Sequence, residues 1–139
     1  MKIKLYVCTL VILLVADALW LGWIAKDFFY SRLAPVIPLT ASPVLLPTLL
    51  FYLLFTAGLL AFAVTPAIKE NSLRSAWLRG GFFGLVTYAT YDLTNQAFIR
   101  NWPAAVTLLD LVWGSSISAV VSAIVCLIGK HSKKENNVS

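Results

Sequence analysis

Three aspartates stand inside stretches of apolar residues, where a carboxylate is unusual. Asp17, Asp92 and Asp110 each lie within a run of about 20 mostly apolar residues, whereas the other acids lie between or after such runs. A charged side chain at the centre of a membrane helix costs about 2.5–3.5 kcal/mol on insertion scales. Acids retained at that cost usually face the interior of a helix bundle and handle ions, protons or substrates. We therefore treat these aspartates as candidate functional residues.

Polar and aromatic side chains accompany each acid at helical spacing. Tyr88, Asp92 and Asn95 share one helix face, because residues three or four positions apart lie on the same side of a helix. Aromatic side chains also follow Asp17 and Asp110 by one turn. The spacing predicts a ligand-binding pocket formed by Asp17, Trp20, Tyr88, Tyr91, Asp92, Asn95, Asp110 and Trp113.

The composition indicates a protein that lies within a lipid bilayer. Of 139 residues, 60% are hydrophobic and only 12% are charged, whereas about 25% charged residues is usual in soluble domains. With two cysteines and one histidine, neither a disulfide framework nor a zinc or haem site is expected. The net charge of +5 comes from scattered basic residues rather than a basic stripe, so we expect no nucleic-acid partner.

The apolar runs predict an all-α integral membrane protein, a bundle of four transmembrane helices. The expected spans are residues 3–25, 44–64, 76–98 and 104–128, each near the ~20 residues that a bilayer core requires. They form one domain, residues 1–129, followed by a polar basic tail, residues 130–139. Proline in the connection at residues 26–43 argues against a continuous helix there.

The basic residues predict the orientation of this bundle. With the amino terminus inside, the cytoplasmic segments hold Lys2, Lys4, Lys69, Arg74, Arg79, Lys130, Lys133 and Lys134, and the outer segments hold Lys26, Arg32 and Arg100. This bias places both termini in the cytoplasm. From the rise per residue, all three aspartates then lie within about 6–9 Å of the outer edge of the hydrocarbon core. One polar layer in the outer leaflet is therefore expected.

Small and aromatic residues suggest how the helices pack and where they end. Gly80 and Gly84 form a small-residue stripe, and Gly114, Ser118 and Ser122 form another, which is typical of close helix packing. Trp23 and Trp102 are expected at the outer membrane interface and Trp77 at the inner one.

Several motifs resemble a known family. The run from Tyr88 to Asn95 (YATYDLTN), Trp102-Pro103, and the segment from Asp110 to Gly114 resemble the signature of a bacterial family of small four-helix inner-membrane proteins of unknown function. Asp17 with Trp20-Leu21-Gly22, Phe29-Tyr30 and Phe51-Tyr52 resemble its remaining marks. The resemblance implies a multi-pass protein of a bacterial inner membrane and implies no activity.

Three functional interpretations remain open. The pocket could bind or transport a small molecule or lipid headgroup, cationic or rich in hydroxyls, and transport by so few helices would call for a homodimer. A lipid-active membrane enzyme could instead use the aspartates as acid, base or metal ligands. The polar layer could also serve helix packing alone. No cofactor is expected, although a divalent cation held by Asp17, Asp92 and Asp110 would suit the carboxylates.

Overall fold

The computed structural model describes residues 2–40 and 42–136, and within these ranges all regular structure is helical. The longest connection lies between α2 and α3, and the other helices follow one another directly or after a few residues. In chain order the elements are α1 (Lys2–Leu19), η1 (Trp20–Ile24), α2 (Lys26–Leu33), α3 (Leu45–Leu59), η2 (Leu60–Val64), α4 (Thr65–Lys69), α5 (Leu73–Phe98) and α6 (Ala104–Asn136).

Three helices are long and apolar enough to cross a bilayer. Among the described residues these are Lys2–Ile24, Leu45–Lys69 and Ala104–Glu135, which overlap the first and second expected spans to within one residue and contain the fourth. Many of their apolar side chains, such as those of Val11, Val15 and Leu54, are exposed on the protein surface. An extended exposed apolar surface of this kind fits contact with lipid. The third expected span lies in α5, whose 26 residues include two arginines and Asp92 and which is not among the three apolar helices.

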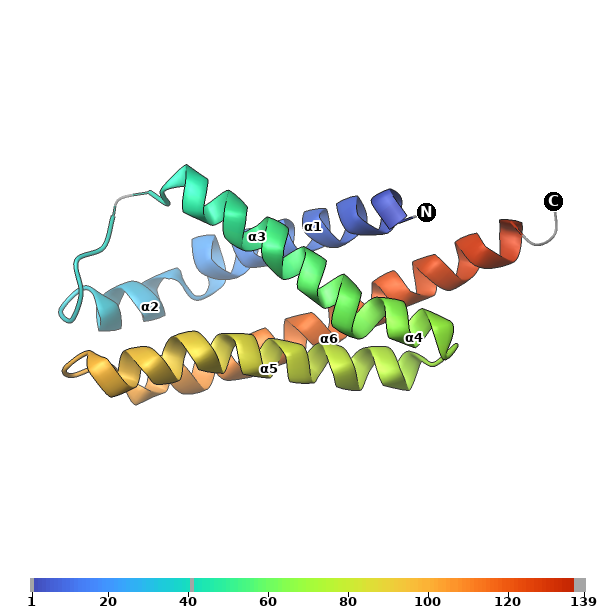
Figure 1. Ribbon diagram of the computed structural model, residues 1–139. Helices are drawn as coiled ribbons and strands as arrows, with labels where there is room; N and C mark the ends of the chain where they lie inside the picture. Colours follow the sequence, from blue (N-terminus) through green and yellow to red (C-terminus); the bar gives the residue numbers. More distant parts are fainter. Residues whose placement is uncertain (1, 41, 137–139) are drawn as a thin grey trace.

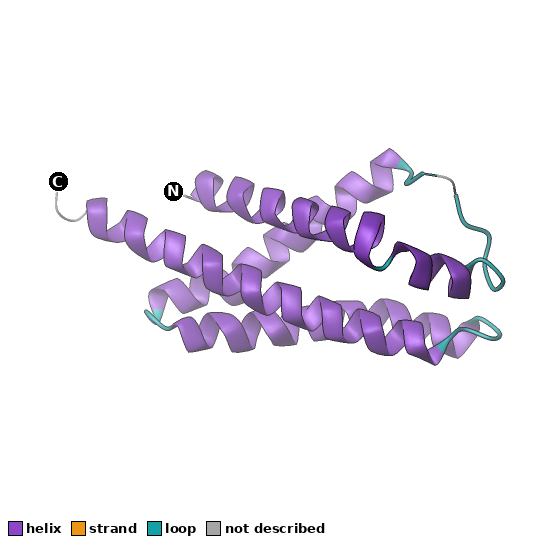
Figure 2. Ribbon diagram, turned by 180° about the vertical axis from the view of Figure 1, so that it is seen from behind, coloured by secondary structure: helices purple, strands orange, loops and turns teal. Residues whose placement is uncertain are grey.

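The helices pack in two crossing layers (Figure 1). α5 and α6 run antiparallel and lie side by side, and α1 and α3 cross each other on one side of this pair. The start of α1 and the end of α6 lie at the same end of the bundle, together with the α4–α5 connection. α2 and the α5–α6 connection lie at the opposite end, and the view from behind shows the same arrangement (Figure 2).

Small residues set the spacing between α5 and α6. A Cβ atom added to Gly84 would lie 2.1 Å from the carbonyl oxygen of Gly114, and one added to Gly80 would lie 2.3 Å from Ser122 Oγ. Neither position could carry a larger side chain without moving the helices apart. The predicted packing role of the two small-residue stripes is confirmed.

Wider helical turns and a short extra helix depart from the expected elements. The first membrane helix ends in the π-helical turn η1, where Ala25 N donates to Trp20 O at 2.7 Å. α2 follows in a connection expected to lack a continuous helix, and its eight residues precede the prolines at positions 35, 38 and 43. The chain is therefore interrupted twice, at Ala25 before α2 and in the proline-containing segment after it.

α2 covers one end of the bundle. Phe29 of α2 packs in a buried cluster with Ala25, Trp102 and Val106. The indole N–H of Trp102 donates to Thr107 Oγ1 at 3.1 Å, and only 7% of Trp102 is exposed. The Trp102 indole is therefore enclosed by protein, and its expected place at the outer membrane interface stays a prediction. Trp23, in contrast, is 78% exposed.

The last helix continues beyond the expected span. α6 runs without a break through Gly129 to Asn136, so most of the segment expected as a polar tail is helical. Residues 137–139 lie outside the described residues.

Candidate functional site

A cavity of about 700 Å³, which we call the aspartate cavity, lies between α1, α2, α3, α5 and α6. Six of the eight residues predicted for the pocket line it: Asp17, Trp20, Tyr88, Tyr91, Asp110 and Trp113. The other lining residues are Leu21, Phe29, Leu33, Phe51, Tyr52, Phe55, Thr87, Thr90 and Thr94. The structure therefore brings most of the predicted site residues together from three separate helices.

Asp17 is held in the cavity wall by donors from two other helices. The Tyr52 hydroxyl donates to Asp17 Oδ2 at 2.8 Å, and the Trp113 indole N–H donates to Asp17 Oδ1 at 3.0 Å. Asp17 is only 6% exposed. Because hydrogen bonds to a charged acceptor are stronger than neutral ones, this arrangement fixes the carboxyl group and joins α1, α3 and α6 around it.

Two stacked indole rings belong to the cavity lining. The rings of Trp20 and Trp113 lie 4.4 Å apart between centroids, with planes 2° from parallel. Trp20 belongs to the π-helical turn η1, and such turns often occur at functional sites. The buried Trp20 Nε1 has no hydrogen-bond partner in the described structure. It is therefore an unsatisfied donor inside the protein.

Asp92 lies next to Asp110 and does not line the aspartate cavity. Its side chain is fully buried, and neither Oδ1 nor Oδ2 accepts a hydrogen bond from a described N–H or O–H group. Its interacting neighbour is the carboxyl group of Asp110, which lines the cavity and also interacts with Asp17. Two carboxylates side by side repel each other, so a shared proton or a cation would stabilise this pair.

Asn95 does not join the group. It shares a helix with Asp92 and is half-buried, but it does not line the aspartate cavity. The three aspartates also do not form a metal-binding cluster. Within residues 2–40 and 42–136, no group of three or more His, Cys, Asp or Glu side chains is arranged to hold a metal ion.

Tyr52 was not predicted as a site residue, although it provides a hydrogen bond to Asp17. Phe29 and Phe51 also line the cavity without having been predicted for it. A signal for all three existed in the sequence, because the Phe29-Tyr30 and Phe51-Tyr52 pairs are among the motifs that resemble the family. Their spacing to an acid could not reveal them, since they lie on other elements.

The cavity is covered at one end and exposed at its side. Phe29 and Leu33 of α2 form part of its lining where α2 covers the bundle. On the side between α3 and α5, the lining residues Phe51 and Tyr91 are 47% and 58% exposed. α3, η2 and α4 form one continuous helical segment, and α5 contacts it mainly through η2 and α4. The first turns of α3 therefore diverge from α5. The opening therefore faces the surroundings of the helices rather than the end of the bundle.

The chemistry of the lining favours a positively charged ligand. Asp17 and Asp110 contribute carboxyl groups, and the aromatic rings contribute electron-rich faces. No Lys, Arg or His side chain lines the described cavity. Carboxylates and aromatic faces without a competing cation are the usual surroundings of a bound ammonium group.

Apolar helices long enough to cross a bilayer, with acids buried between them, define this chain as a membrane protein. Residues 2–127 match the family described as "Predicted membrane protein (DUF2177)", and the chain belongs to this family, whose function is unknown. No curated protein and no solved structure matches the chain.

Proposed function

We propose that the protein binds or transports a positively charged small molecule or lipid headgroup, and that this ligand occupies the aspartate cavity within the membrane. The observation that carries this proposal is the buried Asp17 carboxyl group, which Tyr52 and Trp113 hold in the cavity wall. No Lys, Arg or His side chain lines the described cavity. An ammonium group would interact with Asp17 and Asp110 and with the aromatic faces. The side opening would admit an amphiphile from the lipid.

The proposal includes a topology and a location. We propose that the rods formed by α1 and η1, by α3 to α4, by α5 and by α6 all cross a bacterial inner membrane, with both termini in the cytoplasm. A 26-residue α5 is about 39 Å long and so exceeds the ~30 Å hydrocarbon core. The start of α1 and the end of α6 lie at one end of the bundle, where the basic residues are concentrated. The aspartate cavity then lies in the outer half.

The test uses two amphiphiles of nearly the same shape, decyltrimethylammonium and the uncharged decyldimethylamine oxide. Each is titrated at pH 7.5 into the protein in nanodiscs, and the heat of partitioning into empty nanodiscs is subtracted. We expect the ammonium to bind at least about tenfold more tightly, because only it carries a net positive charge for the carboxylates and rings. Asp17→Asn should remove this preference, while Asp27→Asn, at an exposed site on α2, should retain it.

Equal binding of the two amphiphiles, or an unchanged preference in Asp17→Asn, would refute a cation site. Transport would be followed separately as movement of the ammonium across liposomes. Because four helices form a small transporter, we expect that activity to require a homodimer.

One observation favours a second candidate, a lipid-active enzyme. Asp92 and Asp110 form a pair of adjacent carboxyl groups, one buried and one lining the cavity. Such a pair can act as general acid and general base on a substrate that enters from the side. Release of a modified lipid from a defined bilayer, lost in Asp110→Asn, would favour this candidate over binding alone.

A further inference from the structure

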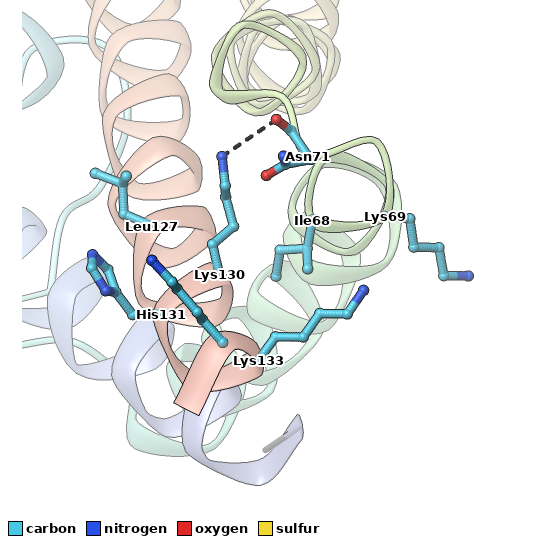
Figure 3. Close-up of a pocket in the computed structure, with 8 residues that line it drawn as sticks. Ile68, Lys69, Asn71, Leu127, Lys130, His131 and Lys133 are labelled. Carbon is cyan, nitrogen blue, oxygen red and sulfur yellow. Dashed lines mark hydrogen bonds between the residues drawn. The ribbon is translucent and has the colours of Figure 1, made fainter. Parts of the chain in front are cut away.

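A second cavity, which we call the lysine cavity, lies at the opposite end of the bundle from α2. It has a volume of about 490 Å³ and lies between the end of α4 and the last turns of α6 (Figure 3). It shares no lining residue with the aspartate cavity. Any ligand in it would therefore be bound independently of the proposed function.

The lining of the lysine cavity is strongly basic. Its titratable lining residues are Lys69, Lys130, His131, Lys133 and Lys134. No carboxylate lines it in the described structure. Glu70, which follows Lys69, instead pairs with Arg79 at 2.8 Å. Basic groups concentrated around a cavity attract an anion more strongly than the same charges spread over a surface.

Lys130 is fixed at the centre of this cluster. Its ammonium Nζ donates to the backbone carbonyl oxygen of Asn71 at 3.3 Å (Figure 3). Asn71 has a φ of 54°, a left-handed conformation that Asn adopts more readily than most residues. Because an ammonium has three N–H donors, this one bond leaves others for an anion. Lys130 is therefore held in place while N–H groups of its ammonium stay available to an anion.

An apolar wall completes the cavity. Ile68 and Leu127 line it beside the lysines, and Leu127 is 42% exposed. α4 approaches α6 closely here, since a Cβ atom on Gly129 would lie 2.4 Å from Ile68 Cδ1. A free phosphate would need only the cationic groups. Cationic groups next to exposed apolar side chains suit a phosphate joined to an acyl chain.

We propose that the lysine cavity binds the phosphate group of an anionic phospholipid, with its acyl chain beside Leu127. Lys130 and Lys133 of α6 contact the phosphate beside Ile68 of α4, whereas the Lys69 side chain points away from α6 (Figure 3). The same lysines also suit the carboxyl end of α6, where the helix dipole favours cations. The experiment must therefore separate a site from general surface charge.

The test compares two double variants that lose the same charge. Lys130→Gln with Lys133→Gln removes charge inside the cavity, and Lys2→Gln with Arg74→Gln removes it from exposed positions outside the cavity. Native mass spectrometry measures retained phosphatidylglycerol and phosphatidylcholine after release from mixed nanodiscs. We expect the cavity variant to retain about tenfold less phosphatidylglycerol. The control variant should stay close to the unmodified protein.

Lys130→Arg with Lys133→Arg checks that the loss arises from charge rather than misfolding, since it should retain phosphatidylglycerol. Equal loss in the cavity and control variants would overturn the site in favour of general surface charge. Equal retention of the two lipids by the unmodified protein would overturn the preference for an anionic headgroup. Binding of inorganic phosphate by the unmodified protein without retention of phosphatidylglycerol would overturn the lipid assignment and identify a free-phosphate site.

Discussion

The carboxyl group of Asp92 is the least satisfied polar group in the protein interior that the structure describes. Both oxygens are buried without a donor, and the neighbouring group is another carboxyl. Asp92→Asn removes one charge and adds an N–H donor for Asp110. We expect it to raise the free energy of unfolding by about 1–3 kcal/mol, the cost of an unsatisfied buried polar group. Denaturation in detergent micelles measures this change.

Asp27→Asn provides the control, because an exposed substitution should change stability by less than about 0.5 kcal/mol. A less stable Asp92→Asn protein would mean that the charged carboxyl group contributes to packing.

At the level of single residues, sequence spacing identified groups on one helix and not partners across helices. Tyr88, Asp92 and Asn95 were grouped because they share a face of α5, yet only Tyr88 lines the aspartate cavity. A helix face is wide, and the crossing of α1 and α3 determines which part of it meets the cavity. The hydrogen bond from Tyr52 to Asp17 depends on that crossing, so no local spacing could predict it.

The contact between α5 and α6 depends on the absence of a side chain at Gly84. In Gly84→Ala the new Cβ would lie 2.1 Å from a backbone oxygen and 2.5 Å from Ser118 Oγ. Backbone atoms cannot turn aside, so the helices must separate. We expect a loss of about 1–3 kcal/mol in the free energy of unfolding, measured in mixed micelles by circular dichroism.

Gly81→Ala is the matched control on the same helix. Its added Cβ would have its nearest neighbour at 3.5 Å, an ordinary contact. Greater damage from Gly81→Ala than from Gly84→Ala would contradict the observed helix pairing.

The long helices were predictable because a run of about 20 apolar residues is typical of a membrane-spanning helix. Their ends and irregular turns were not. The second membrane helix was expected to end at residue 64 but continues through η2 and α4 to Lys69, since Pro66 lies in the first turn of α4, where proline is tolerated. The π-helical turns and α2 depend on contacts such as Phe29 with Trp102, which lie far apart in the sequence.

The proposed topology of the whole molecule can be tested with reporter fusions. Fusions at Lys69 and after Ser139 should give fluorescent green fluorescent protein, which folds inside the cell. Fusions at Arg32 and Asn101 should give active alkaline phosphatase, because these positions lie at the opposite end of the bundle. Different sides for Lys69 and Asn101 would establish that α5 crosses the bilayer. A cytoplasmic reporter at Arg32 would contradict the orientation inferred from the basic residues.

The cover formed by α2 changes which concentration governs occupancy of the aspartate cavity. Under the proposed function, a cavity with its end covered and its side exposed would exchange ligand with the surrounding leaflet. Occupancy then follows the mole fraction of ligand among the lipids rather than its molarity in water. Adding inert lipid at constant total ligand lowers occupancy by surface dilution, and a longer alkyl chain raises apparent affinity through partitioning even where the headgroup contacts are identical.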